Sequence, residues 1–302
     1  MELKVGKINN IERKFIPIRK SKFKKYVQSL QLIEQYKITQ YYKGNYKYRK
    51  FEADDIKYTR SKKEGDKTIV EEITEDIFLS NFEDSKVIVK NRKKYQYDLF
   101  TIEIDYFYKP HEFIMVEVSS DTEDLEKYQN PETLIEVTEN PIFQNKNIAN
   151  GSIQKSNIII EGTDGVGKTT VIKNLLKEGI ICQDRCEDVI SKNMLFDISM
   201  EKRAKEIEEK YFSKNQETMI VFLINLDKQE LQRRINSREK ISEFDLEAYE
   251  YGLLYRDTYE YMIRNYHTGG RLMVVDCTGL SKEEQYEKVK KIIMGWFVWR
   301  KL

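Results

Sequence analysis

A loop at residues 162–169 is the feature that most constrains the fold of this chain. The apolar run Ile158–Ile160 leads through Glu161 into Gly-x-x-x-x-Gly-Lys-Thr, and a helical pattern follows directly. The glycines let successive backbone N–H groups turn toward phosphate oxygens, and the following helix adds its positive N-terminal end. A strand, this loop and a helix in that order predict a nucleotide-binding P-loop in an α/β domain.

The P-loop predicts a site for ATP and Mg²⁺. Lys168 supplies a point charge beside the transferred phosphoryl group, and the hydroxyl of Thr169 is a ligand for Mg²⁺. A glycine-rich turn without a ligand is the alternative, and the flanking strand and helix argue against it. The residues expected to contact the nucleotide are Gly162, Asp164, Gly165, Val166, Gly167, Lys168, Thr169 and Thr170.

Length and charge limit the remaining possibilities. A chain of 302 residues is expected to form two domains. Its net charge of +1 gives no overall field toward nucleic acid or a membrane, and no apolar run is long enough to span a bilayer. Cys182 and Cys186 have no histidine nearby, so a zinc site is not expected. The scarcity of cysteine and the lack of a signal-peptide pattern predict a cytoplasmic protein.

The hydrophobic period changes along the chain and predicts domains at 1–150 and 151–302. Up to about residue 145, apolar and charged residues mostly alternate, with helical patterns near 21–36 and 122–128. Residues 147–156 have the composition of a linker. Beyond it, longer helices separate the strands, which predicts a parallel sheet flanked by helices. The expected strands are 157–161, 179–184, 218–225 and 271–276, and the expected helices are 168–177, 200–213, 227–238, 244–266 and 281–294.

Charged residues near the ends of these elements complete the predicted catalytic set. Asp184 and Arg185 follow a strand, at the edge where open α/β sheets bind ligands. Asp184 is expected to hold Mg²⁺ or its water, and Arg185 to clamp a second phosphate. Arg234 and Arg238 are expected to close over the transferring group as a lid does, and Arg256 is a weaker candidate. A surface ion pair and a solvated basic face are the alternatives.

The second half resembles thymidylate kinases and close nucleoside-monophosphate kinases. Residues 161–170 resemble their P-loop, Asp184-Arg185 their Asp-Arg motif, residues 234–238 their lid, and residues 274–276 their last strand. The resemblance implies transfer of a phosphoryl group from ATP to a nucleoside monophosphate. The interval between the P-loop and Asp184 is much shorter than in that family, where it shapes the nucleoside pocket, so a preference for thymidine is not implied.

In the first half, charges of one sign share strand faces. The two-residue alternation places Lys47 with Arg49, and Glu103 with Asp105. A solvated sheet face would mix signs to relieve repulsion between strands. If these faces line the inside of a barrel, its basic walls bind phosphates and its acidic walls bind Mg²⁺ or Mn²⁺. An amphipathic antiparallel sheet with its charged face in water is the alternative.

Residues 8–150 resemble the CYTH, or triphosphate tunnel metalloenzyme, superfamily. Residues 9–16, Asn-Asn-Ile-Glu-Arg-Lys-Phe-Ile, resemble its opening Glu-x-Glu-x-Lys signature, and residues 131–145 resemble its closing segment. The resemblance implies a closed antiparallel β-barrel that holds a triphosphate compound and a divalent metal. It implies phosphate contacts from Lys14, Lys47, Arg49, Lys62, Lys90 and Arg92, and a metal site from Glu12, Glu72, Glu103, Asp105 and Glu117.

The acidic positions depart from that superfamily's pattern. Asn10, Thr74 and Ser119 stand where glutamate is frequent, whereas the basic positions are retained. Phosphate binding is therefore expected to persist, while the metal wall is thinned. The fold expected for the whole chain is an α+β tunnel domain followed by an α/β P-loop kinase domain.

Together the halves predict a bifunctional enzyme, a nucleotide kinase joined to a metal-dependent triphosphatase. The expected partners are nucleotides and triphosphate small molecules, with no membrane, and a homodimer is compatible with the sequence. One alternative makes the first half a non-catalytic triphosphate sensor that regulates the kinase. Another has the pair process RNA 5′ ends, with the aromatic and basic residues of 41–50 contacting RNA, although the near-neutral charge argues against a large nucleic-acid footprint.

Overall fold

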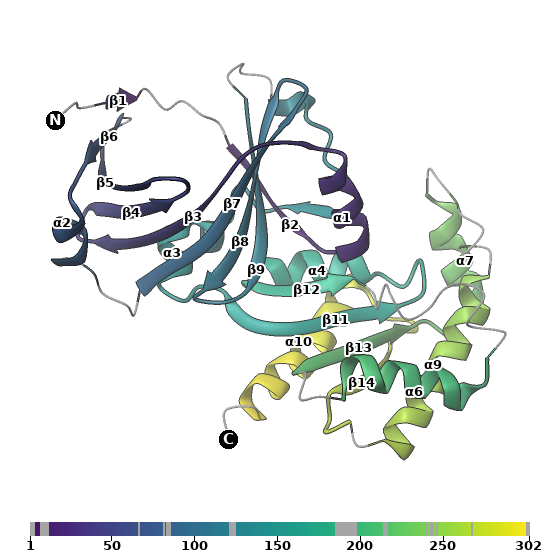
Figure 1. Cartoon of the computed structure of the whole chain (residues 1–302). Helices are drawn as coiled ribbons and strands as arrows, with labels where there is room; N and C mark the ends of the chain where they lie inside the picture. Colours follow the sequence, from purple (N-terminus) through teal and green to yellow (C-terminus); the bar gives the residue numbers. More distant parts are fainter. Residues whose placement is uncertain are drawn as a thin grey trace. The chain divides into compact units, whose positions relative to one another are not determined.

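The computed structural model describes residues 4–6, 12–65, 67–80, 82, 86–120, 125–184, 198–213, 217–238, 241, 245, 247–266 and 268–299. The chain divides into two compact units, residues 1–18 with 22–155 and residues 19–21 with 156–302, and Figure 1 traces it through both. Asn10 and Arg185 lie outside the described residues. Within the described part of the chain, every helix is too short or too polar to cross a membrane.

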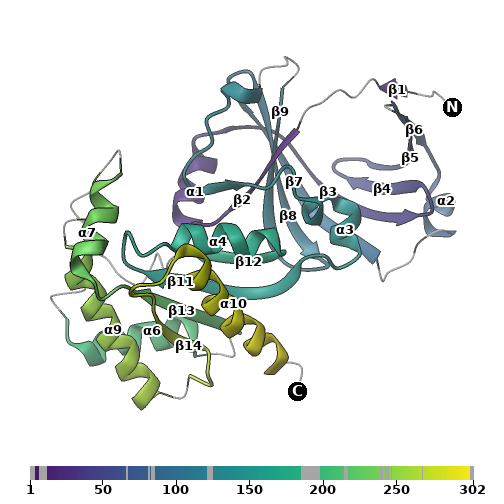
Figure 2. The same ribbon diagram turned by 180° about the vertical axis from the view of Figure 1, so that it is seen from behind.

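The first unit contains an antiparallel sheet of ten strands. In spatial order these are β1 (Lys4–Gly6), β6 (Lys67–Glu72), β5 (Ile56–Glu64), β4 (Tyr46–Glu52), β3 (Gln31–Lys43), β7 (Val87–Tyr97), β8 (Phe100–Lys109), β9 (Phe113–Ser119), β2 (Glu12–Pro17) and β10 (Leu134–Glu136). The edge strands β1 and β10 have three residues each, and among the described residues they do not pair with each other. The sheet twists and curls, and pairing among the described strands does not close it into the barrel expected from the sequence (Figures 1 and 2).

Alternation along the strands gives this sheet an apolar face and a charged face. Phe15, Ile104 and Val116 are fully buried on the apolar face, in a core that also takes in Phe23 of helix α1 (Lys20–Gln28). A second, smaller cluster packs Tyr41 and neighbouring side chains under helix α2 (Glu75–Ser80). Burial of this apolar area is the main term that holds the sheet and its helices together.

The predicted helix near 21–36 is shorter in the structure. Helix α1 ends at Gln28, and residues 31–36, predicted helical, begin β3, because pairing along β7 outweighs their local helical preference. Strand β6 ends at Glu72 and α2 begins at Glu75, so Thr74 lies between the two elements.

The predicted linker is also structured. Helix α3 (Asn145–Ala149) enters it and β11 begins at Gln154, and Ile148 within α3 and Ile153 just before β11 are both buried. Of the predicted helix at 122–128, the described part contains only the 3₁₀ turn η2 (Leu125–Lys127), and a further such turn is η3 (Pro141–Phe143).

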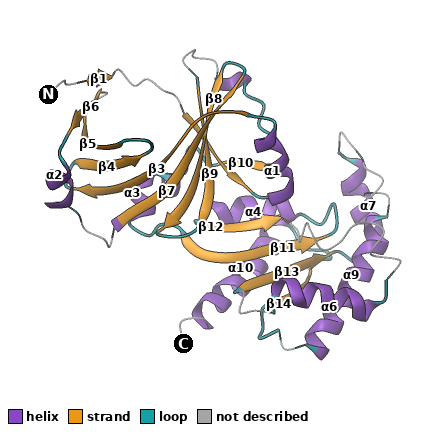
Figure 3. Cartoon of the chain, in the orientation of Figure 1, coloured by secondary structure: helices purple, strands orange, loops and turns teal. Residues whose placement is uncertain are grey.

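The second unit is built as the sequence predicts, with strands and helices in alternation (Figure 3). Its sheet has the order β12 (Ile180–Asp184), β11 (Gln154–Gly162), β13 (Thr218–Ile224) and β14 (Leu272–Asp276), and β11, β13 and β14 are parallel. The helices are α4 (Lys168–Lys177), α6 (Met200–Tyr211), α7 (Lys228–Asn236), α9 (Ala248–Asn265) and α10 (Lys282–Trp299). Helices α6 and α9 bury Phe222 of the central strand β13, and α4 packs against α10 (Figure 2).

Candidate functional sites

The loop between β11 and α4 has the backbone that a phosphate-binding loop needs. Gly162, Gly165 and Gly167 have φ angles of 142°, 84° and 104°. Glycine reaches these values freely, whereas other residues are strained there. A Cβ on Gly162 would lie 2.4 Å from the carbonyl oxygen of Leu223 on the neighbouring strand. The glycines predicted as nucleotide contacts are therefore required by the shape of the loop.

The side chain of Lys168 is held in place by backbone carbonyl oxygens of the loop. It is the first residue of α4 and is buried, and its Nζ donates to the carbonyl oxygens of Gly162 at 2.6 Å and Thr163 at 2.7 Å. The ammonium group is thus fixed beside the turn through which a phosphate would be bound. Thr169 is exposed on the same first turn, and Thr170 is half-buried.

Gln285 of α10 supports the other side of the loop. Its Nε2 donates to the carbonyl oxygen of Val166 at 2.8 Å, and a Cβ on Gly167 would stand 2.9 Å from its Oε1. No sequence pattern marked Gln285, because it lies far from the loop along the chain and acts only through the packing of α10 on α4.

We expect Gly167→Ala to destabilise the second unit by about 1–3 kcal/mol, the usual cost of a strained backbone conformation. Both tryptophans, Trp296 and Trp299, belong to this unit, so the midpoint of urea unfolding followed by tryptophan fluorescence measures the effect. Gly295→Ala is the matched control, because a Cβ there meets open space and alanine favours a helix. Equal midpoints for the two variants would contradict the assigned loop strain.

Asp184 lies at the end of β12, the strand beside β11, and is fully buried. Arg19, which groups with the second unit, donates from Nε to its Oδ2 at 2.7 Å and pairs with it through Nη2 at 2.7 Å. Its Oδ1 accepts no hydrogen bond from the described residues. A carboxylate with one free oxygen and the exposed Thr169 hydroxyl have the oxygen chemistry that Mg²⁺ requires.

Of the predicted lid arginines, only Arg238 reaches the loop within the described residues. Its Nη1 lies 2.7 Å from Asp245 Oδ1 and 3.8 Å from Oδ1 of Asp164 in the P-loop. Arg234 instead pairs at 2.8 Å with Glu230 on its own helix. Arg256 pairs at 2.7 Å with the adjacent Asp257. The structure therefore brings Arg238 together with the P-loop and leaves Arg234 and Arg256 in local ion pairs.

A second candidate site lies on the charged face of the first unit, around Arg92 of β7. Arg92 donates to Asp105 from Nε and from Nη2, each at 2.7 Å, to Glu117 at 2.6 Å, and to Glu103. The strand register brings these four side chains together, because Arg92 stands opposite Asp105 on β8 and Glu103 stands opposite Glu117 on β9. Part of the predicted basic wall is therefore joined to the predicted acidic wall in one ion-pair network.

Two lysines complete the network. Lys90 is buried and pairs with Asp105, and Lys14 of β2 lies 3.1 Å from Glu117. Burial alone would raise the pKa of Glu117, but Arg92, Lys14 and Lys90 hold it well below its ordinary value. Burial likewise acts to lower the pKa of Arg92, and the carboxylates around it raise that pKa well above its ordinary value. Both shifts favour the charged forms of Glu117 and Arg92.

Lys47 and Arg49 of β4 stand apart from these pairs. Arg49 donates from Nε to Oε1 of the buried Gln40 at 2.8 Å, and Gln40 donates in turn to the hydroxyl of Tyr42 at 2.7 Å. Among the described residues, no carboxylate forms an ion pair with either cation. Burial, together with the charges of Arg49, Lys90 and Lys63, lowers the pKa of Lys47 to about 7. Within the described part of the chain, Lys47 and Arg49 therefore lack a paired carboxylate, unlike Lys50 of the same strand, which pairs with Glu52.

Of two further predicted site residues, Lys62 lies away from this face, and Glu72 lies on it but is exposed. Lys62 is next to Ser61, which stands opposite Lys47, so Lys62 points to the other face of β5 and pairs with Glu64 at 2.5 Å. Lys63 is the lysine that shares the face of Lys47, and strict alternation from Ser61 would have found it. Glu72 stands opposite Thr59, which stands opposite Arg49, so it shares their face, where it is exposed and pairs at 3.1 Å with Lys57.

The acidic residues do not fit the divalent-metal site expected from the sequence. Within the described part of the chain, no group of three or more acidic, histidine or cysteine side chains is arranged to hold a metal. Glu103, Asp105 and Glu117 are each bonded to Arg92 instead. Burial, followed by the charge of Glu117, raises the pKa of Glu12.

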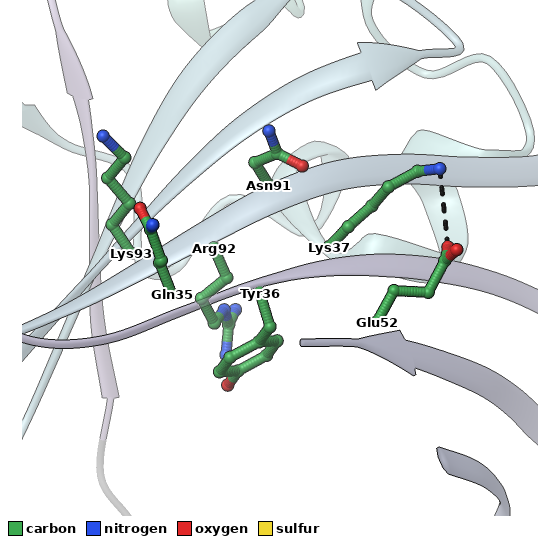
Figure 4. Close-up of a pocket in the computed structure, with 7 residues that line it drawn as sticks. All are labelled: Gln35, Tyr36, Lys37, Glu52, Asn91, Arg92 and Lys93. Carbon is green, nitrogen blue, oxygen red and sulfur yellow. Dashed lines mark ion pairs between the residues drawn. The ribbon is translucent and has the colours of Figure 1, made fainter. Parts of the chain in front are cut away.

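A shallow pocket of about 260 Å³ lies over β3 and β7, lined by Gln35, Tyr36, Lys37, Glu52, Asn91, Arg92 and Lys93. In Figure 4, Tyr36 and Arg92 point to one side of the strands, and Lys37 and Asn91 point to the other. Lys37 pairs with Glu52 across this pocket at 3.4 Å. The pocket thus lies largely on the opposite face of the sheet, and of the residues in the ion-pair network it includes Arg92 alone among its lining.

The aromatic and basic segment 41–50 is used within the fold. Tyr41 and Tyr48 are buried and stack with ring centroids 4.8 Å apart, and the guanidinium of Arg60 lies 4.7 Å from the ring of Tyr46. These rings are covered by protein neighbours, which weighs against their predicted stacking on RNA bases.

No protein-family model matches this chain, and no curated protein matches it. Among solved structures, the hypothetical protein NE1496 matches the N-terminal half with 20% identity and a TM-score of 0.35, over 47% of this chain and 97% of that chain. The inorganic triphosphatase NE1496 matches with 21% identity and a TM-score of 0.34, over 46% and 96%. The PH1819 protein from Pyrococcus horikoshii OT3 matches with 16% identity and a TM-score of 0.30, over 39% and 80%. Likeness at this level assigns no activity to this chain.

Proposed function

We propose that this chain is a phosphate-handling enzyme whose second unit transfers the γ-phosphoryl group of ATP to a nucleoside monophosphate. The observation that supports this most directly is the loop 162–169, with its glycine backbone and its buried Lys168. Phosphoryl transfer asks the protein chiefly for positioning and for charge stabilisation, and this loop is suited to both.

Each residue has a distinct role in the proposed reaction. Loop N–H groups and Lys168 hold the β- and γ-phosphates, and Lys168 stabilises the charge of the transferring group. Thr169 and Asp184 would hold Mg²⁺, which neutralises phosphate charge when bound. Arg238, already 3.8 Å from Asp164, turns toward the phosphates when nucleotide is present. Arg185 clamps the acceptor phosphate in this proposal.

A screen of acceptors tests the proposal. Purified chain is incubated with Mg-ATP and each of a panel of nucleoside monophosphates, and ADP and nucleoside diphosphate are separated by ion-exchange chromatography. Formation of ADP in step with a nucleoside diphosphate supports the kinase assignment. ADP and inorganic phosphate without a phosphorylated acceptor would instead indicate a nucleoside triphosphatase.

For the first unit, we propose that the charged face binds a triphosphate compound. The cations of β4 support this, because Lys47 and Arg49 lie partly buried with no paired carboxylate among the described residues. Hydrolysis and sensing are both compatible with such binding. The bonding of Arg92 to Glu103, Asp105 and Glu117 favours the sensor, because it occupies the side chains that would serve a metal or activate water.

Binding of inorganic tripolyphosphate to the first unit is expected to weaken as pH rises above about 7. Lys47, with its pKa lowered to about 7, loses its proton there, and an anion prefers the protonated form. The dissociation constant should rise up to about tenfold per pH unit, with proton uptake on binding. Titration calorimetry in buffers of different ionisation enthalpy measures both. Lys47→Arg, which stays charged, should flatten the profile relative to wild type, and an unchanged profile in that variant would refute the role of Lys47.

A further inference from the structure

We infer that the first unit binds polyphosphate without a divalent metal, with Arg92 as a built-in cation for the acidic cluster and Lys47 and Arg49 as the phosphate contacts. This inference rests on the proposed triphosphate binding of that unit and specifies its mode. It divides the predicted cations into two groups with different partners. One group neutralises carboxylates of the chain, and the other is left for a ligand.

The acidic cluster is already saturated by protein cations. Asp105 accepts from Arg92 at one oxygen and from Arg92 and Lys90 at the other. Glu117 bonds Lys14 through Oε1 and Arg92 through Oε2. A metal ion at these carboxylates would have to displace Arg92, whose side chain is only 13% exposed. A guanidinium left partly buried without its anions is strongly unfavourable, so the existing pairs resist a metal.

Lys47 and Arg49 of β4, by contrast, have no paired carboxylate among the described residues. Arg49 is oriented through Gln40, which is itself fixed by Tyr42, so its guanidinium is placed before any ligand arrives. Two adjacent cations on one strand face repel each other until an anion lies between them, and Lys63 adds further positive charge from β5. Phosphate oxygens suit a guanidinium because they accept two parallel hydrogen bonds. Metal-free polyphosphate also carries more negative charge than its Mg²⁺ complex, so it interacts more strongly with this strand.

The experiment is calorimetric titration of inorganic tripolyphosphate into the full chain carrying Lys168→Ala, which weakens the P-loop as a competing site. It is run once with excess EDTA and once with excess Mg²⁺. We expect binding in EDTA with an affinity equal to or higher than that in Mg²⁺. Arg49→Ala in the same background should weaken binding by about tenfold or more, since it removes a hydrogen bond to a charged group.

Lys50→Ala is the matched control. Lys50 is the next residue on β4, points to the other face and pairs with Glu52 at 3.2 Å, so its removal should leave the affinity unchanged within about twofold. Binding that requires Mg²⁺ would overturn the inference and leave the proposed triphosphate site standing. Equal losses for the Arg49 and Lys50 variants would overturn the assignment of the contacts. Failure of tripolyphosphate to bind in either condition would refute the proposed function of the first unit itself.

Discussion

Replacing Lys168 by alanine is expected to lower ATP-dependent phosphoryl transfer by about 100- to 1,000-fold, the loss usual for one electrostatic group at a developing charge. The ammonium group is fixed by the carbonyl oxygens of Gly162 and Thr163, so it is in place before the nucleotide binds. A fixed charge stabilises the transition state without having to reorganise during the reaction. The measurement is the initial rate of nucleoside diphosphate formation with saturating ATP and the acceptor identified by the screen.

Lys173→Ala controls for a general effect on α4, because Lys173 lies on the same helix with an exposed side chain and should retain full activity. Tryptophan fluorescence checks that both variants keep the second unit folded, since Trp296 and Trp299 both belong to it. A folded Lys168→Ala chain that still transfers at the wild-type rate would remove the basis for the kinase assignment.

The second unit could be predicted closely because its local signals agree with each other. Each predicted strand and helix, from 157–161 to 281–294, corresponds to an element of the structure within about three residues, apart from the start of α9 and the end of α10. The P-loop motif requires a strand before it and a helix after it, which predicts β11 and α4. Apolar runs such as Val221–Ile224 predict buried strands, and these residues are buried. The contact of Gln285 with the loop could not be predicted, since it depends on how α10 packs against α4.

The first unit shows what alternation alone can establish. It correctly placed Glu103 with Asp105 on one strand face, but a strand pattern does not specify which residue lies opposite on the next strand. That register places Arg92 opposite Asp105, so basic and acidic residues that the sequence analysis assigned to separate walls form ion pairs with each other. Lys62 was predicted from its order along the chain rather than from alternation, and the pairing of Ser61 with Lys47 places it on the other face.

The Arg92 pairs have a large expected effect on stability. Arg92→Met should destabilise the first unit by about 3–5 kcal/mol, because it leaves Glu103, Asp105 and Glu117 without their shared cation. The sign of the accompanying pH dependence follows from Glu117, whose pKa in the folded chain is depressed. Its contribution is present above its ordinary pKa and is lost as pH falls through the folded value. Wild type should therefore lose stability in acid, and the variant should lose less.

Differential scanning calorimetry measures this effect, with tryptophan fluorescence identifying the transition of the second unit. We expect Arg92→Met to lower the transition that fluorescence does not report, and to leave the other unchanged. Lys93→Ala is the control, because Lys93 is adjacent on β7 and forms no ion pair with these carboxylates among the described residues. If both variants unfold with the wild-type profile at neutral pH, Arg92 is not the cation that compensates the acidic cluster. The carboxylates would then be free to recruit a metal, which would also undermine metal-free binding of polyphosphate.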